Sequence, residues 1–117
     1  MAVPALPLRP IAYLMAHRRA PQADADLDSI WDYVASKSGS FDAADRLIDS
    51  VTSRFVLLAN HPYVGRARDD DLRLHLRSFP AGEFVIIYRI EDDEVAILRV
   101  VRDSRDIAAL LFDAGST

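Results

Sequence analysis

Three consecutive segments between Leu72 and Arg102 alternate apolar and polar side chains with the two-residue period of β-strands. They constrain the fold more than any other part of the chain. The segments read LRLHLRSF, FVIIYRIE and EVAILRVVR, and only Asp92-Asp93 separate the last two, as in a hairpin. Successive side chains of a strand point to opposite faces of its sheet. The segments therefore predict a three-stranded antiparallel sheet over residues 72–102.

The length of the turn between the last two segments decides which side chains share a face. A three-residue connection from Asp92 to Glu94 with a bulge pairs Glu91 with Val95, whereas a two-residue turn pairs Ile90 with Val95. We predict the three-residue connection, because it assembles an almost purely apolar face for the core. That face comprises Phe84, Ile86, Tyr88, Ile90, Leu98 and Val100.

The opposite face of the predicted sheet is basic. The three-residue turn places Arg89, Ile97 and Arg99 together on this face, and the first strand adds its own outward arginines. The arginines expected here are Arg73, Arg77, Arg89 and Arg99. A cationic and partly apolar surface of this kind is suited to an anionic partner.

Two amphipathic helices precede the sheet. Pro21 opens the first helix, Ser38-Gly39-Ser40 ends it, and the second runs from Phe41 or Asp42 to about Asn60. The apolar stripe of the first comprises Ala23, Leu27, Ile30, Trp31 and Val34. Because the connection is so short, we expect an antiparallel helix hairpin packed on the apolar face of the sheet.

The two ends of the chain complete an α+β domain in this prediction. Residues 16–20 form a short N-terminal edge strand, and residues 107–112 form a short C-terminal helix. We expect one domain over residues 15–112, a flexible extension at 1–14 and a tail at 113–117. The extension contains prolines and lacks the pattern of a secretory signal, and Met15 is a candidate for the native start.

The composition excludes several classes of function. The chain has 117 residues, half of them hydrophobic, and a net charge of -4, so we do not expect the protein alone to bind DNA. The absence of cysteine excludes a thiolate nucleophile and is compatible with the cytoplasm, where we expect the protein. No segment approaches the length of a membrane span, and no spacing indicates a metal or cofactor site.

Short motifs follow one another along both halves of the chain. They are Ala23–Leu27, Ile30–Tyr33 and Ala44–Ile48, then Pro62 with Gly65-Arg66, Leu76–Pro80, Ile87–Arg89, Ile97–Val100 and Arg105-Asp106. Their order and spacing over residues 16–111 resemble the ParE toxins of the RelE/ParE superfamily of bacterial toxin-antitoxin systems. Two positions depart from the family pattern: Arg102 stands where a histidine is frequent, and Glu94 where glycine commonly ends the turn.

This resemblance implies a small toxin built from a strand, a helix hairpin and an antiparallel sheet. It also implies a ParD-like antitoxin whose C-terminal segment wraps around the toxin in a hetero-oligomer. ParE members are associated with poisoning DNA gyrase, whereas RelE members cut mRNA in the ribosome. By resemblance we expect gyrase as the target, with ribosome-dependent mRNA cleavage as the alternative.

The residues favour a binding toxin over an enzyme. RNA cleavage needs a proton acceptor, a proton donor and cations that stabilise the phosphorane. The weak candidates for these roles are His75, Arg77 and Arg99, and His75 is the only histidine predicted on the basic face. A binding toxin needs only a shaped and charged surface, so we expect no catalytic residues.

The residues predicted to bind the antitoxin or the target are outward arginines of the sheet, apolar side chains between them, and two arginines that follow. They are Arg73, Arg77, Arg89, Ile97, Arg99, Val101, Arg102 and Arg105. On this prediction, Arg77→Glu and Arg99→Glu weaken antitoxin binding and leave the fold intact.

Overall fold

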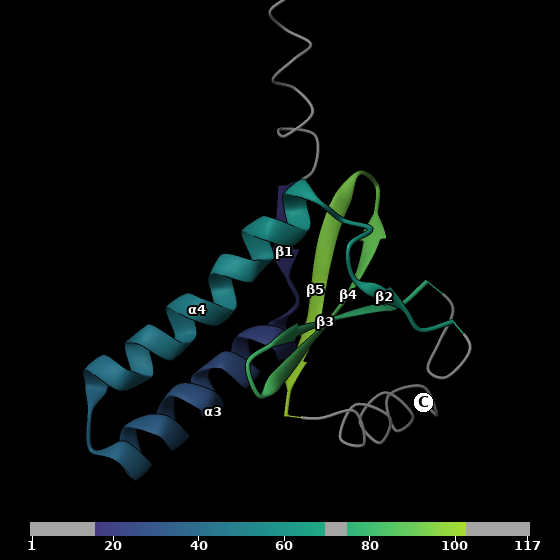
Figure 1. Ribbon diagram of the computed structural model, residues 1–117. Coiled ribbons are helices and arrows are strands. Elements are labelled where there is room, and N and C mark those ends of the chain that lie inside the picture. The colour runs from purple at the N-terminus through teal and green to yellow at the C-terminus, as the bar shows by residue number, and fades with distance from the viewer. Residues whose placement is uncertain (1–15, 70–74, 103–117) are drawn as a thin grey trace, which may run out of the picture.

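A helix hairpin packs on one face of a five-stranded sheet in the computed structural model, which describes residues 16–69 and 75–102 (Figure 1). The elements are β1 (Ala16–Arg19), α3 (Pro21–Ser38), α4 (Phe41–Asn60), β2 (Arg66–Ala67), β3 (Arg77–Ala81), β4 (Phe84–Glu91) and β5 (Glu94–Val101). The strand order is β1-β5-β4-β3-β2, with β1 parallel to β5 and the other neighbours antiparallel. The predicted extension, C-terminal helix and tail lie outside the described residues.

The helix hairpin forms where the sequence predicts it. Pro21 begins α3, and Gly39 ends it in the left-handed conformation (φ 69°), with its N–H donating to the Ala35 carbonyl at 2.9 Å. Ser40 then starts α4, because its hydroxyl accepts the Ala43 N–H at 3.0 Å. No helix in the described part of the chain is long and apolar enough to cross a membrane.

The sheet has more strands than the sequence suggested. The predicted edge strand at residues 16–20 is present and extends the sheet beyond β5, while the short β2 pairs with the start of β3. The first of the three predicted strands begins later than expected: His75 has φ 68°, and β3 starts at Arg77. The His75 N–H donates to the Asp69 carboxylate at 2.8 Å, so His75 lies in a turn and not on a strand.

The predicted three-residue turn between β4 and β5 is wrong. Glu91 pairs with Glu94 and Ile90 pairs with Val95, so Asp92 and Asp93 form a two-residue turn. Both aspartates have positive φ (49° and 63°), as the type I′ hairpin turn requires. Asp is one of the few residues besides glycine that adopts this conformation readily.

An irregularity in the middle of the hairpin replaces the bulge expected at the turn. Tyr88 pairs with Ile97, whereas Ile87 pairs with Arg99, so Leu98 is the extra residue on β5. The predicted face assignments of the hairpin therefore change only between the two-residue turn and Leu98. Ile97 is fully buried on the helix-covered face, while Leu98 packs against the small cluster on the other face.

The main core lies between the helix hairpin and the sheet. The helices contribute Leu27, Val51, Phe55 and Leu58, which are at most 6% exposed. The buried side chains that the sheet adds are Ala81, Phe84, Ile86, Tyr88, Val95, Ile97 and Val100. A smaller cluster of Leu76, Ile87 and Val101 lies on the opposite face. The sheet is therefore apolar on both faces.

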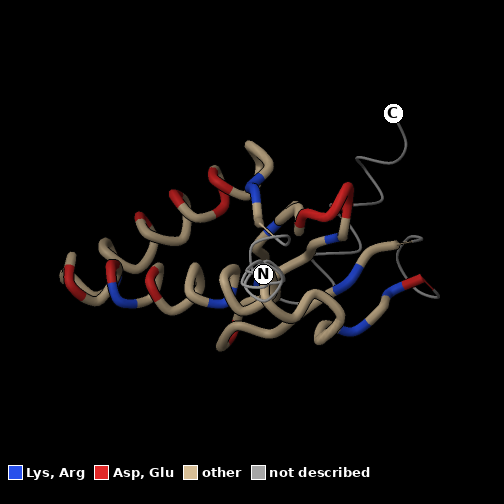
Figure 2. The backbone as a smooth tube through the Cα atoms, turned by 90° about the horizontal axis from the view of Figure 1, so that it is seen from above, with Lys and Arg blue, Asp and Glu red and all other residues tan. Residues whose placement is uncertain are grey.

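Acidic residues gather on the helices and at the β4–β5 turn (Figure 2). Four of the aspartates belong to α3, and four consecutive acidic residues surround the β4–β5 turn. The acidic residues of the turn are partly neutralised, because Arg18 of β1 pairs with Glu91 and, at 3.0 Å, with Glu94. These exposed pairs contribute little to stability.

Candidate partner-binding site

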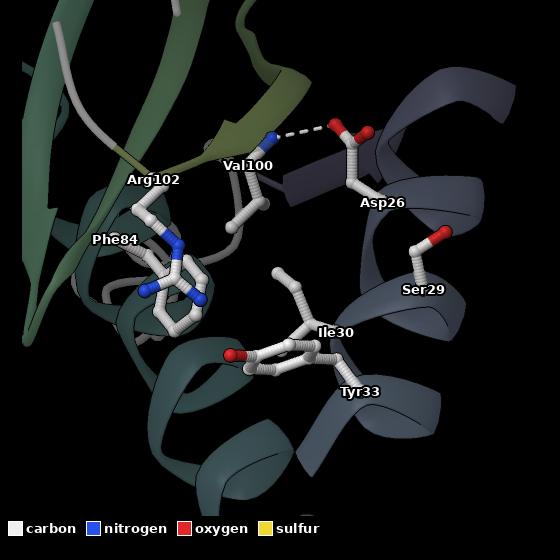
Figure 3. Close-up of a pocket in the computed structure, with 7 residues that line it drawn as sticks. All are labelled: Asp26, Ser29, Ile30, Tyr33, Phe84, Val100 and Arg102. Atoms are coloured by element: carbon white, nitrogen blue, oxygen red, sulfur yellow. Dashed lines mark hydrogen bonds between the residues drawn. The ribbon is translucent and has the colours of Figure 1, made fainter. Parts of the chain in front are cut away.

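A shallow pocket of about 200 Å³ lies between α3, the start of β4 and the end of β5 (Figure 3). The residues that line it are Asp26, Ser29, Ile30, Tyr33, Phe84, Val100 and Arg102. We call it the Arg102 pocket. Its apolar part comes from Ile30, Tyr33, Phe84 and Val100, and Figure 3 shows Arg102 beside the Phe84 ring and facing Tyr33. A small apolar surface with one cation beside it is suited to an amphipathic segment of a partner.

The Arg102 side chain is available to a partner. Its guanidinium carbon lies 5.5 Å from the ring centre of Tyr33 and 5.3 Å from that of Phe84, so two cation–π contacts hold it above the pocket. Among the described residues its one ion pair is with Glu83 at 2.9 Å, and the two side chains are 47% and 66% exposed. Solvent screens such a pair strongly, so a carboxylate from a partner can replace Glu83 at little cost.

Asp26 neutralises Arg99 at the other side of the pocket. Arg99 donates to both carboxylate oxygens of Asp26, at 2.8 and 2.9 Å, and the Val100 N–H also donates to Asp26 at 2.9 Å. These hydrogen bonds to Asp26 raise the pKa of Arg99. Because Asp26 is satisfied within the protein, the charge that the pocket offers a partner is that of Arg102.

A second group of polar side chains lies around the loop between α4 and β2. Arg77 donates to the carbonyl oxygens of Tyr63 and Gly65, at 3.0 and 2.7 Å. The Tyr88 hydroxyl donates to the Pro62 carbonyl at 2.7 Å and accepts the Gly65 N–H at 3.0 Å. Burial raises the pKa of Tyr88, although hydrogen bonds with Gly65 and Arg77 oppose the shift, so the hydroxyl stays protonated. Two side chains of the sheet thus fix this loop.

The prediction that four arginines share one basic sheet face is wrong. Arg77 pairs with Tyr88 across β3 and β4, so it lies on the helix-covered face, whereas Arg89 lies on the opposite face. Arg89 and Arg99 do share a face, but Arg89 lies 2.5 Å from Glu91 and Arg99 is bound to Asp26. Arg73 lies outside the described residues.

The remaining predicted binding residues differ in their accessibility. Arg102 is exposed at the pocket, Val101 is 7% exposed, and Ile97 is fully buried in the core. Arg105 lies outside the described residues. Of the three weak catalytic candidates, His75 and Arg77 line one small pocket of about 210 Å³ together with Tyr63 and Ile90, whereas Arg99 is bound to Asp26 on α3.

Sequence reasoning missed the helical side of the Arg102 pocket. The sequence places Ile30 in the apolar stripe of the helix and assigns no binding role to Ser29 or Tyr33, although all three line the pocket. Tyr33 is an aromatic residue outside the apolar stripe of α3, and it is 51% exposed. An aromatic side chain on the polar face of an amphipathic helix is the signal that could have identified it.

Comparison with known proteins gives matches over most of the chain. A family model described as the ParE toxin of the type II toxin-antitoxin system parDE matches residues 18–107. Toxin RelE3 of Caulobacter vibrioides is 36% identical over 80 residues, which cover 68% of this chain and 85% of that protein. Toxin ParE1 of the same organism is 34% identical over 95 residues, which cover 81% of this chain and 96% of that protein.

A solved structure shares the fold. The structure named "Chromosomal ParDE TA system from P. aeruginosa" superposes with a TM-score of 0.68 at 22% sequence identity. The superposition covers 79% of this chain and 99% of that chain. The helix hairpin and the sheet therefore form a known arrangement.

Proposed function

Because this chain belongs to the ParE toxin family of type II toxin-antitoxin systems, we propose that it poisons DNA gyrase and is neutralised by a cognate ParD-like antitoxin. The observation that carries the proposal is the family match over residues 18–107. Relatives named Toxin ParE1 and Toxin ParE3, 34% and 31% identical, support it further. A toxin of this kind arrests growth when it is expressed alone and is harmless when its antitoxin is expressed with it.

The Arg102 pocket is the proposed docking point for the antitoxin. An apolar side chain of the antitoxin fills the space beside Ile30, Phe84 and Val100, and a neighbouring carboxylate pairs with Arg102. Arg102 supports this assignment because it lies at the pocket and has only the exposed Glu83 as an ion-pair partner among the described residues. Of the residues predicted from sequence to bind the partner, Arg102 fits this role best.

The Arg102→Glu variant tests this docking point. We expect it to weaken antitoxin binding roughly 10- to 100-fold, because the new carboxylate repels that of the partner and removes the cation–π contacts. Titration calorimetry with the purified antitoxin measures the change. The matched control is Arg66→Glu, which reverses another exposed arginine at the opposite edge of the sheet. Equal effects of the two variants would contradict docking at this pocket.

Ribosome-dependent mRNA cleavage is the second candidate function. Two observations favour it: one relative at 36% identity is named Toxin RelE3, and His75, Arg77 and Tyr63 line one pocket. If the toxin is such an endonuclease, translated messages are cut at discrete positions and His75→Ala abolishes the cuts. Intact messages in arrested cells would exclude this function.

A further inference from the structure

The loop between α4 and β2 presents two apolar side chains to solvent in a fixed geometry. Tyr63 is 72% exposed and Val64 is 52% exposed, the former being the most exposed large hydrophobic residue in the described part of the chain. Most large apolar side chains are removed from water on folding. Two adjacent ones at the tip of a loop are the kind of feature that marks a protein interaction site.

Side chains of the sheet hold the backbone of this loop in place. Arg77 and Tyr88 together make four hydrogen bonds to it, through the carbonyl oxygens of Pro62, Tyr63 and Gly65 and the N–H of Gly65. None of these bonds uses the side chain of Tyr63 or Val64. A loop that is already ordered loses little entropy on binding, so its exposed side chains can contribute most of their contact energy to affinity. Rigid exposed tyrosines are frequent among the residues that dominate interface energies.

Two arginines lie close to Tyr63, although the chain as a whole is acidic and Asp69 lies beside His75. The Arg77 guanidinium carbon lies 5.4 Å from the centre of the Tyr63 ring, and the exposed Arg66 follows the loop on β2. His75 lines the small pocket beside Tyr63. The exposed Arg66 and the Arg77 guanidinium are complementary to a protein surface with an apolar pocket and carboxylates around it.

The loop is well separated from the Arg102 pocket. Phe84 at the start of β4 lines the Arg102 pocket, whereas Ile90 near the end of β4 lines the pocket beside Tyr63. Six residues of a β-strand span about 20 Å. Figure 1 shows the same separation, since the loop lies toward the β4–β5 turn and β5 ends on the other side of the molecule. A partner segment can therefore occupy the Arg102 pocket without contacting the loop.

We propose that Tyr63 and Val64 form the surface through which this toxin contacts its protein target, and that the target presents an apolar pocket rimmed by carboxylates. This inference rests on the proposed function, because it assumes that a toxin with a protein target is held by an antitoxin at another surface. Tyr63 fills the apolar pocket of the target, Val64 packs at its edge, and Arg66 pairs with a carboxylate. The two partners of the toxin then recognise different ends of the sheet.

Two variants of the loop and one matched control test the inference. Tyr63→Ala removes the aromatic ring, and Val64→Asp places a negative charge against the acidic target, while both keep the four hydrogen bonds of the loop. Tyr33→Ala is the control, because Tyr33 is also an exposed tyrosine (51%) but lines the Arg102 pocket. The measurements are the inducer level that arrests growth, the toxin concentration that halves gyrase supercoiling, and the affinity for the antitoxin.

We expect growth arrest and gyrase inhibition to require at least about ten-fold more of each loop variant than of the wild-type toxin. The affinity of each loop variant for the antitoxin changes by less than about three-fold. Tyr33→Ala, in contrast, weakens antitoxin binding and changes arrest and inhibition by less than about three-fold. Full toxicity of both loop variants would overturn the inference, as would a loss of antitoxin affinity equal to the loss of toxicity. If wild-type toxin leaves gyrase unaffected but arrest still depends on Tyr63, gyrase is the wrong target and the surface stands. Discrete mRNA cuts that disappear in Tyr63→Ala would replace the protein target by RNA and overturn it.

Discussion

Replacing Gly65 with alanine is expected to cost about 4 kcal/mol of the free energy of unfolding. A Cβ atom at this position would overlap the Tyr88 hydroxyl, approach Tyr88 Cε1 to 2.7 Å and approach the Ser78 carbonyl oxygen to 2.8 Å. Tyr88 is fully buried, and the Ser78 carbonyl is part of the backbone of β3, so neither group can move aside easily. The loop must shift instead, and it then loses its hydrogen bonds to Tyr88.

Urea unfolding followed by circular dichroism measures this effect. The matched control is Gly39→Ala, because a Cβ added there meets no atom within 4 Å in the described part of the chain beyond its adjacent residues. Gly39 has a φ of 69°, so alanine costs only about 1 kcal/mol from backbone strain. A Gly65→Ala protein as stable as Gly39→Ala would show that the loop does not pack against Tyr88 as described.

Arg77→Glu is expected to cost about 3 kcal/mol of the free energy of unfolding. The guanidinium donates to the carbonyl oxygens of Tyr63 and Gly65, and a carboxylate in its place faces two acceptors and leaves both without a donor. The cation–π contact with Tyr63 is lost as well. Urea unfolding measures the change, with the exposed Arg66→Glu as a control that shifts stability by less than about 0.5 kcal/mol.

This expectation reverses the one drawn from the sequence, in which Arg77→Glu weakens antitoxin binding and leaves the fold intact. The sequence pattern places Arg77 on the outer face of the sheet, whereas its pairing with Tyr88 places it toward the helices and the loop. A variant with normal stability and lost antitoxin affinity would support the sequence-based interpretation and contradict the role of Arg77 in holding the loop.

The parts of the fold that the sequence predicts correctly depend on local signals. Pro21, Gly39 and Ser40 mark the ends of the helices by backbone geometry and hydrogen bonding that involve only neighbouring residues. The alternation in residues 84–91 and 94–101 identifies β4 and β5, because both strands are regular over most of their length. The α+β architecture follows from these elements.

The register could not be predicted, because it depends on backbone conformations that the residue types allow but do not require. Asp92 and Asp93 adopt positive φ, and the extra residue sits at Leu98 in the middle of β5 instead of at the turn. His75 also has positive φ, so the alternation predicted from Leu72 onward does not continue through it. The two-residue turn reverses the face of Ile97, and the pairing of β3 with β4 reverses that of Arg77.

The candidate site was predicted only in part for a different reason. Arg102 could be named from its place after the last strand, but its neighbours Tyr33 and Phe84 come from other elements. Likewise, Asp26 binds Arg99 across a separation of 73 residues. Periodicity identifies which face of an element is buried, whereas contacts of this kind depend on how α3 packs against β5.

Conversion of relaxed plasmid to supercoiled plasmid by purified DNA gyrase is the most direct test of the proposed activity. The toxin is added at increasing concentration, and circular dichroism confirms that it is folded. We predict that the toxin inhibits supercoiling, that linear plasmid from trapped cleavage complexes accumulates, and that a stoichiometric amount of antitoxin reverses both effects. Unchanged supercoiling and no linear plasmid at saturating folded toxin would contradict gyrase as the target.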